Sequence, residues 1–355
     1  MVEQIEQGIY RIGVELPQNP LREINSYVLR GEGRDLIIDT GFNRPECLAA
    51  LQSGIEELGL DMSKTDLFLT HLHSDHAGLA SKIASPTSRI YMSTVDSRGM
   101  NAFLLDPNGW ENQARRFLEE GFPVAEFEQV KANNPGRLYQ SSHTLDTLPA
   151  DDGMVIEVGG IRLECIATPG HTPGHTCLYW PERKILFSGD HVLFNITPNI
   201  SIWESLPDPL ATYFASLGKI YRLPVRLCLP GHRANSEHLQ ERIQALLHHH
   251  RERLEEVVRL IRDNPGIGAY DTARRMTWSI RSKGWEDFPV GQKWFAVGEA
   301  MTHLACLVNL GILQKQQLPE GYSYTFVKEI DLEQAILDYF EGRRMPAPPV
   351  SGGVR

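Results

Sequence analysis

The sequence is poor in cysteine and has no two cysteines at the spacing of a metal or redox motif. Its five cysteines are an odd number in a chain of 355 residues, and no Cys-x-x-Cys pair occurs among them. A disulfide framework and a cysteine-rich zinc site are therefore excluded as the feature that organises the fold. We expect buried thiols in a protein of a reducing compartment, with the cytoplasm as the default location.

The sequence also lacks segments that would direct the chain to a membrane or to nucleic acid. Residues 1–6 hold no basic segment followed by an apolar one, so no signal peptide is indicated. No apolar run approaches the roughly 18–20 residues that a membrane span needs. Basic residues are in deficit, with 35 Lys and Arg against 45 Asp and Glu and a formal net charge of −10. This balance disfavours a polyanionic partner, because proteins that bind nucleic acid are usually basic.

Strand and helix patterns alternate along the first part of the chain. Hydrophobic residues make up 41% of the sequence, which is enough for a buried core. Strands are predicted at residues 9–12, 26–29, 35–39, 67–69, 90–92, 155–156, 161–166, 177–180, 184–187 and 227–229. Helices are predicted at residues 46–58, 76–84, 94–105 and 208–220. The alternation predicts an α/β fold.

Composition changes along the chain suggest its domains. Residues 1–235 are expected to form one domain, interrupted by an insertion at 106–150, for which a lid and a solvated excursion without a role fit equally well. Residues 236–263 predict one long linking helix. The Asn264-Pro265-Gly266 break then separates a small C-terminal domain and tail, residues 264–355.

The sequence is rich in histidine, with 13 residues, and the densest group follows an apolar strand. His71, His73, Asp75 and His76 fall within six residues. Residues two apart on an extended segment point the same way, so His71 and His73 can hold one metal together. A following turn can bring Asp75 and His76 to a second metal beside it. Imidazole and carboxylate ligands suit Zn²⁺, and also Fe and Mn.

Three later segments add further candidate ligands, each just past an apolar strand. They contain His171 and His175 in residues 167–175, Asp190 in residues 187–190, and His232 in residues 229–232. An α/β core gathers its functional loops at such strand ends. Each segment alone is weak, but the four together predict one metal site.

The four segments resemble the motifs of the metallo-β-lactamase superfamily, and within it the binuclear hydrolases that include glyoxalase II. The resemblance covers about residues 5–235 and implies an αββα sandwich with the active site at one edge of both sheets. It implies a first metal held by His71, His73 and His171, a second held by Asp75, His76 and His232, and Asp190 bridging both. It also makes Asp39, in Ile38-Asp39-Thr40-Gly41, a supporting group rather than a ligand. His175 becomes a catalytic candidate, placed beside the ligands or facing substrate, and His191 becomes a structural residue or a group beside the ligands.

This ligand set predicts a mechanism without a protein nucleophile. Two divalent ions, with Zn²⁺ favoured and Fe or Mn as alternatives, can share a water and yield a bridging hydroxide near neutral pH. They also polarise the substrate oxygen. Asp75 is a catalytic candidate because it can orient that water or accept its proton.

Departures from the resemblance bear on the substrate. The best-known lactamases carry Cys where Asp190 stands and lack the second His of the first motif. An ester, thioester, lactone or phosphodiester therefore fits better than a β-lactam. A persulfide dioxygenase, which uses a similar motif with one iron, is a weaker alternative.

Residues 264–340 resemble the small winged-helix domain that follows the hydrolase domain in some relatives, one of which cuts RNA. A metal-dependent ribonuclease or phosphodiesterase is therefore the alternative function. Residues 264–355 contain 10 Lys and Arg and 10 Asp and Glu, however, so this domain is neutral. Nucleic acid is thus a possible partner but not the favoured one, although Arg274, Arg275, Arg281 and Lys283 could form a local basic patch.

The C-terminal region has two simpler roles open to it. A helix-rich cap or a homodimer contact is favoured over a nucleic-acid-binding domain. For the whole protein we expect a small molecule as substrate and no membrane partner. The run His248-His249-His250 is expected to lie on a solvated helix face, because adjacent helical residues point about 100° apart and cannot share one metal.

Overall fold

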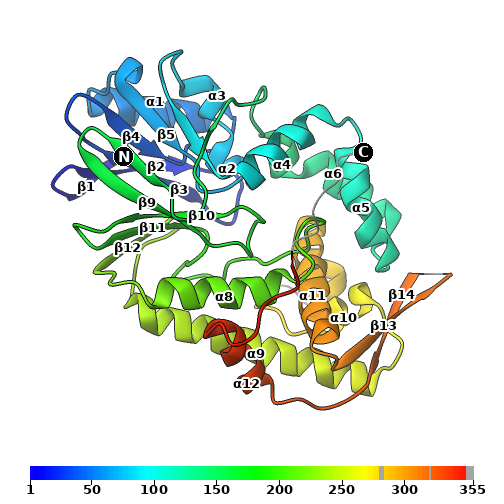
Figure 1. Ribbon diagram of the computed structural model, residues 1–355. Coiled ribbons are helices and arrows are strands. Elements are labelled where there is room, and N and C mark those ends of the chain that lie inside the picture. Colours follow the sequence, from blue (N-terminus) through cyan, green and yellow to red (C-terminus); the bar gives the residue numbers. More distant parts are fainter. Residues whose placement is uncertain (280–283, 320, 349–355) are drawn as a thin grey trace. The chain divides into compact units, whose positions relative to one another are not determined.

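The computed structural model describes residues 1–279, 284–319 and 321–348 (Figure 1), and they form two compact units. Unit 1 contains residues 1–107, 135–198 and 223–239, and unit 2 contains residues 108–134, 199–222 and 240–355. The expected hydrolase domain, residues 1–235, is therefore not one continuous body, since 108–134 and 199–222 pack with the C-terminal residues. The long helix expected at 236–263 belongs almost entirely to unit 2.

The first sheet of unit 1 has seven strands in sequence order. They are β1 (Val2–Glu6), β2 (Ile9–Glu15), β3 (Glu23–Leu29), β4 (Asp35–Ile38), β5 (Thr65–Phe68), β6 (Ile90–Met92) and β7 (Leu148–Pro149). The pairs from β1 to β4 are antiparallel, and those from β4 to β7 are parallel. Parallel neighbours need crossover connections, which is why helices appear only after β4.

The second sheet of unit 1 has five strands in the order β12-β11-β10-β9-β8. They are β8 (Val155–Val158), β9 (Ile161–Ala167), β10 (Thr176–Trp180), β11 (Ile185–Gly189) and β12 (Leu227–Pro230). All pairs are antiparallel except β11 with β12, which are parallel because the chain passes through unit 2 between them.

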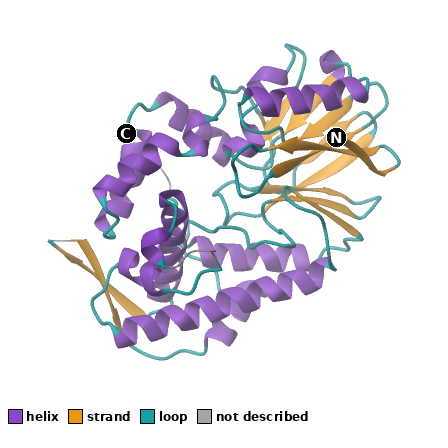
Figure 2. Ribbon diagram, turned by 180° about the vertical axis from the view of Figure 1, so that it is seen from behind, coloured by secondary structure: helices purple, strands orange, loops and turns teal. Residues whose placement is uncertain are grey.

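Two apolar cores hold these layers together. Between the sheets, Tyr27 of β3 meets Phe187 of β11 edge to face with ring centres 5.5 Å apart. On the other face of the first sheet a second core packs against helices. These helices are α1 (Pro45–Glu57), α2 (Ser74–Ala77), α3 (Ala80–Ile83) and α4 (Thr94–Leu105), with the short η1 (Met62–Lys64) and α7 (Pro135–Leu138) in the connections. Figure 2 shows the two sheets as stacked layers with helices over the outer face of the first. The layer order within unit 1 is thus helix, sheet, sheet.

Unit 2 is mainly helical. Its elements are α5 (Gly109–Glu119), α6 (Val124–Asn133), α8 (Pro209–Tyr221), α9 (Leu239–Asp263), α10 (Ala269–Arg275), η2 (Trp285–Asp287), α11 (Val290–Asn309), the hairpin of β13 (Leu313–Leu318) and β14 (Gly321–Phe326), and α12 (Leu332–Phe340). Phe117 of α5 stacks on Trp294 of α11 with ring centres 3.6 Å apart. This packing explains why residues of the insertion join the C-terminal residues in one unit. The sequence pattern along residues 121–150 predicts neither this packing nor α6.

The histidine run on α9 corrects one expectation. His248 is exposed, as predicted, but His250 is buried, and its Nδ1 lies 3.3 Å from Nε2 of His303 on α11. His250 is buried because it lies four residues from both Leu246 and Leu254, in the apolar stripe of the helix.

The five cysteines are all buried free thiols, as the sequence predicts. Within the described residues, no helix combines the length and apolar character that crossing a membrane requires.

Candidate metal centre

The seven predicted ligands, which all belong to unit 1, come together where strands of both sheets end. His71 and His73 follow β5 and lead into α2, which carries Asp75 and His76. His171 follows β9, Asp190 follows β11 and His232 follows β12. Three sets of neighbouring ligand atoms each lie within 4.8 Å of one another: His71, His73 and His171; His71, His76 and Asp190; and Asp75, His76 and His232.

The first subsite is formed by His71, His73 and His171. Nδ1 of His73 lies 3.1 Å from Nε2 of His71 and 3.0 Å from Nε2 of His171. Zinc binds imidazole nitrogen at about 2.0–2.1 Å, so three ligands around one ion would stand roughly this far apart. The three nitrogens are therefore spaced to share one cation.

The second subsite is formed by Asp75, His76 and His232, with Asp190 between the two subsites. Oδ2 of Asp75 lies 3.3 Å from Nε2 of His232. The Asp190 carboxylate lies 3.4 Å from Nε2 of His76, 3.6 Å from Nε2 of His232 and 3.7 Å from Nε2 of His171. Asp190 thus faces ligands of both subsites, as a bridging group would.

Unpartnered buried atoms show that this donor set fits a cation. Nε2 of His76, Nε2 of His232 and Oδ1 of Asp190 are buried and have no hydrogen-bond partner within the described part of the chain. Buried polar atoms are nearly always paired, so three such atoms facing one another require another explanation. A divalent cation coordinated by these atoms would supply it.

Hydrogen bonds at the opposite ring nitrogens orient three of the histidines. Nδ1 of His76 donates to Asp39 Oδ2 at 2.7 Å, Nδ1 of His232 donates to the Glu23 carbonyl at 2.8 Å, and Nδ1 of His71 lies 3.0 Å from Thr70 Oγ1. With Nδ1 as the donor, the lone pair of Nε2 points into the centre. These bonds fix the tautomer that a metal ligand needs.

Asp39 lies in the supporting position that the resemblance implies. Besides His76, it accepts hydrogen bonds from the Thr70 amide and hydroxyl, both at 2.8 Å. Its φ of 60° places it in the left-handed region that non-glycine residues rarely adopt. The strained turn after β4 therefore aims this carboxylate at the segment that carries the first ligands.

His175 lies beneath Asp190. It is fully buried, its Nδ1 lies 2.8 Å from Thr168 Oγ1, and its Nε2 accepts a hydrogen bond from the Asp190 amide at 3.1 Å. Both ring nitrogens are thus engaged, which favours support of Asp190 over contact with substrate. His191 is also buried, and its ring centre lies 6.0 Å from that of His175.

Two glycines allow the ligand loops to approach closely. Gly189 has a φ of +48°, and a Cβ there would lie 2.7 Å from Nε2 of His175. A Cβ on Gly231 would lie 2.6 Å from Oδ1 of Asp190 and 2.9 Å from Cε1 of His76. Neither position has room for a side chain.

The electrostatics differ between the subsites. Burial lowers the pKa of His71 and lowers that of His73 to about 3, so both rings are neutral as metal ligands must be. At His76 and His232 burial acts in the same direction, but nearby carboxylates outweigh it and raise the pKa of both. For Asp190, burial would raise the pKa, yet His232 and His76 hold it well below its usual value. The second subsite therefore attracts positive charge.

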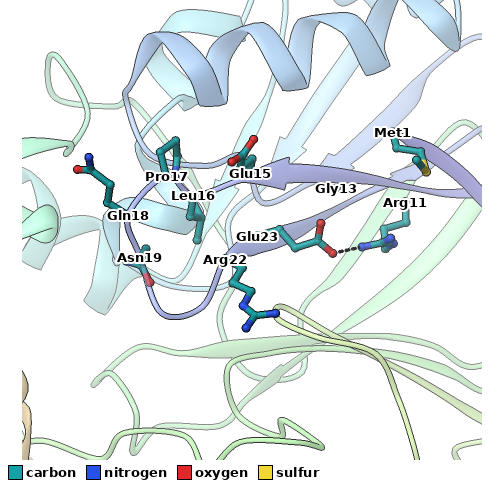
Figure 3. Close-up of a pocket in the computed structure, with 10 residues that line it drawn as sticks. All are labelled: Met1, Arg11, Gly13, Glu15, Leu16, Pro17, Gln18, Asn19, Arg22 and Glu23. Carbon is teal, nitrogen blue, oxygen red and sulfur yellow. Dashed lines mark hydrogen bonds and ion pairs between the residues drawn. The ribbon is translucent and has the colours of Figure 1, made fainter. Parts of the chain in front are cut away.

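The side chain and backbone of Glu23 have different tasks. Its carbonyl fixes His232, whereas its carboxylate pairs with Arg11 Nη1 at 2.8 Å. That ion pair lies in a surface pocket of about 570 Å³, and Figure 3 shows the two side chains facing each other there. The start of β3 thus connects this pocket with a candidate ligand.

Sequence reasoning missed one buried carboxylate, Asp96 on α4. It accepts hydrogen bonds from Leu72, Thr172 and Gly174, which lie in the loops that carry His71, His73 and His171. Burial raises its pKa to about 6 despite these bonds. No local signal marks it, because an Asp in the first turn of a helix is ordinary.

Comparison with known proteins shows the family of the region that contains these residues. The family model of the metallo-beta-lactamase superfamily matches residues 19–232, which contain all the candidate ligands. The beta-lactamase-like protein 2 homolog of Caenorhabditis elegans is 26% identical, over 79% of this chain and 81% of that protein.

Two further proteins are similar in sequence or structure. An atrochrysone carboxyl ACP thioesterase of Emericella nidulans is 26% identical over 65% of this chain, which spans 57% of the thioesterase. The crystal structure of a metallo-beta-lactamase family protein from Thermus thermophilus superposes with a TM-score of 0.77 at 26% identity, over 91% of this chain and 100% of that one.

Proposed function

The chain belongs to the metallo-beta-lactamase superfamily, and on this premise we propose that it is a two-metal hydrolase of an ester, thioester or lactone. The observation that carries the proposal is the group of buried, unpartnered atoms of His76, His232 and Asp190 that faces the three nitrogens of the first subsite. Zn²⁺ is the ion we favour, with Fe and Mn as alternatives, because imidazole and carboxylate accept all three.

When bound, two divalent ions would lower the pKa of a water and polarise the carbonyl oxygen of the substrate. The protein's own part is to hold the ligands and to admit substrate on one side. His73 and Asp75 are half-buried, whereas the other ligands are buried, so substrate reaches the centre from their side. Asp75 is thereby placed to orient the attacking water and to accept its proton.

The ligand types and the relatives support our choice of substrate class. Asp190 takes the position where the best-known lactamases carry Cys, and His76 is a third histidine in the first motif, which favours an ester-like bond over a β-lactam. A relative of 26% identity is named as an atrochrysone carboxyl ACP thioesterase. Among the ester-like bonds we therefore place the thioester first.

The alternative is a phosphodiesterase or ribonuclease helped by residues 264–355. The order α10, α11 and the β13–β14 hairpin is that of a helix pair followed by a wing, and we propose a winged-helix-like fold for this region. Its basic patch is weak, since Arg274 pairs with Glu286 at 3.0 Å and Arg275 with Asp271 at 2.9 Å. Arg281 and Lys283 lie outside the described residues. A contact between two copies of the chain fits this neutral surface better than nucleic acid does.

The test is hydrolysis by Zn²⁺-loaded protein of a panel that contains an acyl thioester, an aryl ester, a lactone and single-stranded RNA. We expect the thioester to be cleaved and His73→Ala to abolish the cleavage. Cleavage of RNA alone, lost in the same variant, would replace the proposal with its alternative.

A further inference from the structure

Asp96 is a buried carboxylate in the first turn of α4, and it touches no candidate ligand atom. Only 1% of its surface is exposed. Ser93 caps the helix, and its hydroxyl accepts a hydrogen bond from the Asp96 amide at 3.2 Å. The helix therefore holds the carboxylate in a fixed place.

The carboxylate accepts three hydrogen bonds from two loops that are far apart in sequence. Oδ2 accepts from the Leu72 amide at 3.0 Å and from the Thr172 hydroxyl at 2.6 Å. Oδ1 accepts from the Gly174 amide at 2.6 Å. Both oxygens are thus used, and one side chain joins the loop after β5 to the loop after β9.

These hydrogen-bond partners of Asp96 lie in the loops of the first subsite and not in those of the second. Leu72 lies between His71 and His73, and Thr172 directly follows His171. These three histidines form the first subsite. The ligands that belong to the second subsite have other supports, namely Asp39 for His76 and the Glu23 carbonyl for His232.

The packing around Gly174 shows that the contact is close. A Cβ on Gly174 would lie 2.3 Å from Ser93 Oγ, 2.6 Å from the Asp96 amide nitrogen and 2.7 Å from Asp96 Oδ1. Because the φ of Gly174 is not positive, the glycine is required here by space rather than by backbone conformation. The His171 loop can approach α4 this closely only without a side chain.

We propose that Asp96 is a positioning residue that assembles the first metal subsite by tying the His71–His73 loop to the His171 loop. The inference rests on the two-metal centre proposed above. Outer groups of this kind usually change metal affinity about 10- to 100-fold when they are removed.

An isosteric change tests the proposal without altering size. In Asp96→Asn one oxygen becomes an NH₂ group, which cannot accept the hydrogen bonds of Gly174 or of Leu72. Whichever way the amide turns, one N–H donor of a ligand loop loses its acceptor. Thr172→Val is the milder variant, because it removes one of the three bonds and keeps the carboxylate.

Asp66 on β5 supplies the matched control. It is equally buried in the same unit and accepts hydrogen bonds from the Arg89 amide at 2.9 Å and from the Arg89 Nε at 2.8 Å, but its partners flank no ligand. Asp66→Asn therefore removes a buried carboxylate without touching the loops of the metal centre. His73→Ala and His232→Ala serve as references for loss of the first and second subsite.

The experiment is a competition titration of the metal-stripped full-length proteins with Zn²⁺ against a chromophoric chelator, followed by Co²⁺ absorption spectra. We expect wild type and Asp66→Asn to bind two ions. In Asp96→Asn one ion should bind about 10- to 100-fold more weakly, with a Co²⁺ spectrum like that of His73→Ala rather than His232→Ala. Thr172→Val should show a smaller shift in the same direction.

Unchanged binding of both ions in Asp96→Asn and Thr172→Val would overturn the proposal, as would equal weakening of both. If thermal unfolding of the stripped protein shows that Asp96→Asn does not fold, Thr172→Val decides in the same way. A wild-type protein that binds no Zn²⁺ would instead refute the proposed function, so the two failures are distinguishable.

Discussion

Two buried aspartates, neither of them a candidate ligand, support the metal centre in different ways. Asp39 bonds directly to the ring of a candidate ligand, His76, and reaches His71 through Thr70. The carboxylate of Asp96 bonds instead to Leu72, Thr172 and Gly174, in the two loops that carry His71, His73 and His171. One carboxylate therefore orients imidazole rings, and the other sets the distance between the segments that carry them.

The comparison shows how a metal site can be built from loops. Ring orientation needs a partner within hydrogen-bond reach of the histidine, and Asp39, just after β4, is that partner for His76. Loop spacing needs a group outside the centre that both loops contact, and the first turn of α4 supplies it. Substitutions of Asp190, of Asp39 and Asp96, and of the close-packed glycines should separate ring orientation from loop spacing.

The largest effect is expected from the group that both subsites share. Asp190→Ala removes the carboxylate that faces His76, His171 and His232, so both subsites should lose affinity for their ion together. We expect loss of both ions and a fall in hydrolysis of at least about 100-fold, the scale found when one charge-stabilising group is removed. Metal analysis and steady-state kinetics check this, and retention of one tightly bound ion would contradict it.

Asp39→Asn should affect the subsites in the opposite order from Asp96→Asn. The direct bond to His76 is lost, so the second ion should bind about 10- to 100-fold more weakly, with a smaller effect on the first through Thr70 and His71. The Zn²⁺ titration used for Asp96 measures this. Equal profiles for the two variants would mean that the two carboxylates do not have separate tasks.

A methyl group at each of two close-packed glycines should weaken one subsite more than the other. Gly231→Ala would place a Cβ against Asp190 and His76, and Gly174→Ala would place one against Ser93 and Asp96. Overpacking of this kind costs about 1–3 kcal/mol of stability. Chemical denaturation gives the cost, and metal titration should show the second ion weakened by Gly231→Ala and the first by Gly174→Ala. Gly153→Ala, where nothing lies within 4 Å of the added Cβ, controls for the extra methyl group, although its φ of +76° adds backbone strain.

The smallest effect concerns the buried histidines of unit 2, which have no role in the centre. Burial lowers the pKa of His303 to about 3 and that of His250 well below its usual value. In the unfolded chain these two imidazoles take up protons as the pH falls through about 6.5, whereas in the folded chain they stay neutral. The free energy of unfolding is therefore highest above pH 6.5 and decreases as the pH falls below it.

Each of these histidines should lower the free energy of unfolding of the protein by about 1.4 kcal/mol when the pH falls from 7.5 to 5.5. Urea unfolding of the full chain at the two pH values should show a reduced difference for His303→Gln. The exposed His248→Gln should behave like wild type. An unchanged difference in His303→Gln would show that His303 is not held neutral by burial.

The sequence was sufficient to find the candidate ligands because they are histidines and aspartates in dense groups after apolar strands. Asp39 was also found, since it lies in a motif at the end of a strand. Asp96 could not be found in this way, because a helical Asp shows no pattern and its partners are 24 and 76–78 residues away.

The same limit applies to the fold. The α/β alternation in residues 1–105 and the strands after 150 follow from local patterns, and the structure confirms the mixed α/β fold of the superfamily. The membership of residues 108–134 in unit 2 depends on contacts such as that of Phe117 with Trp294, nearly 180 residues apart. The burial of His250 likewise depends on what covers its helix face.

The most direct test of the central claim is the metal content of the purified full-length chain after saturation with Zn²⁺ and removal of excess, measured together with thioester hydrolysis. The account predicts about two ions per chain and an activity that requires them, with both reduced in His73→Ala. A content below about 1.5 ions per chain, with His73→Ala changing neither metal content nor activity, would contradict it.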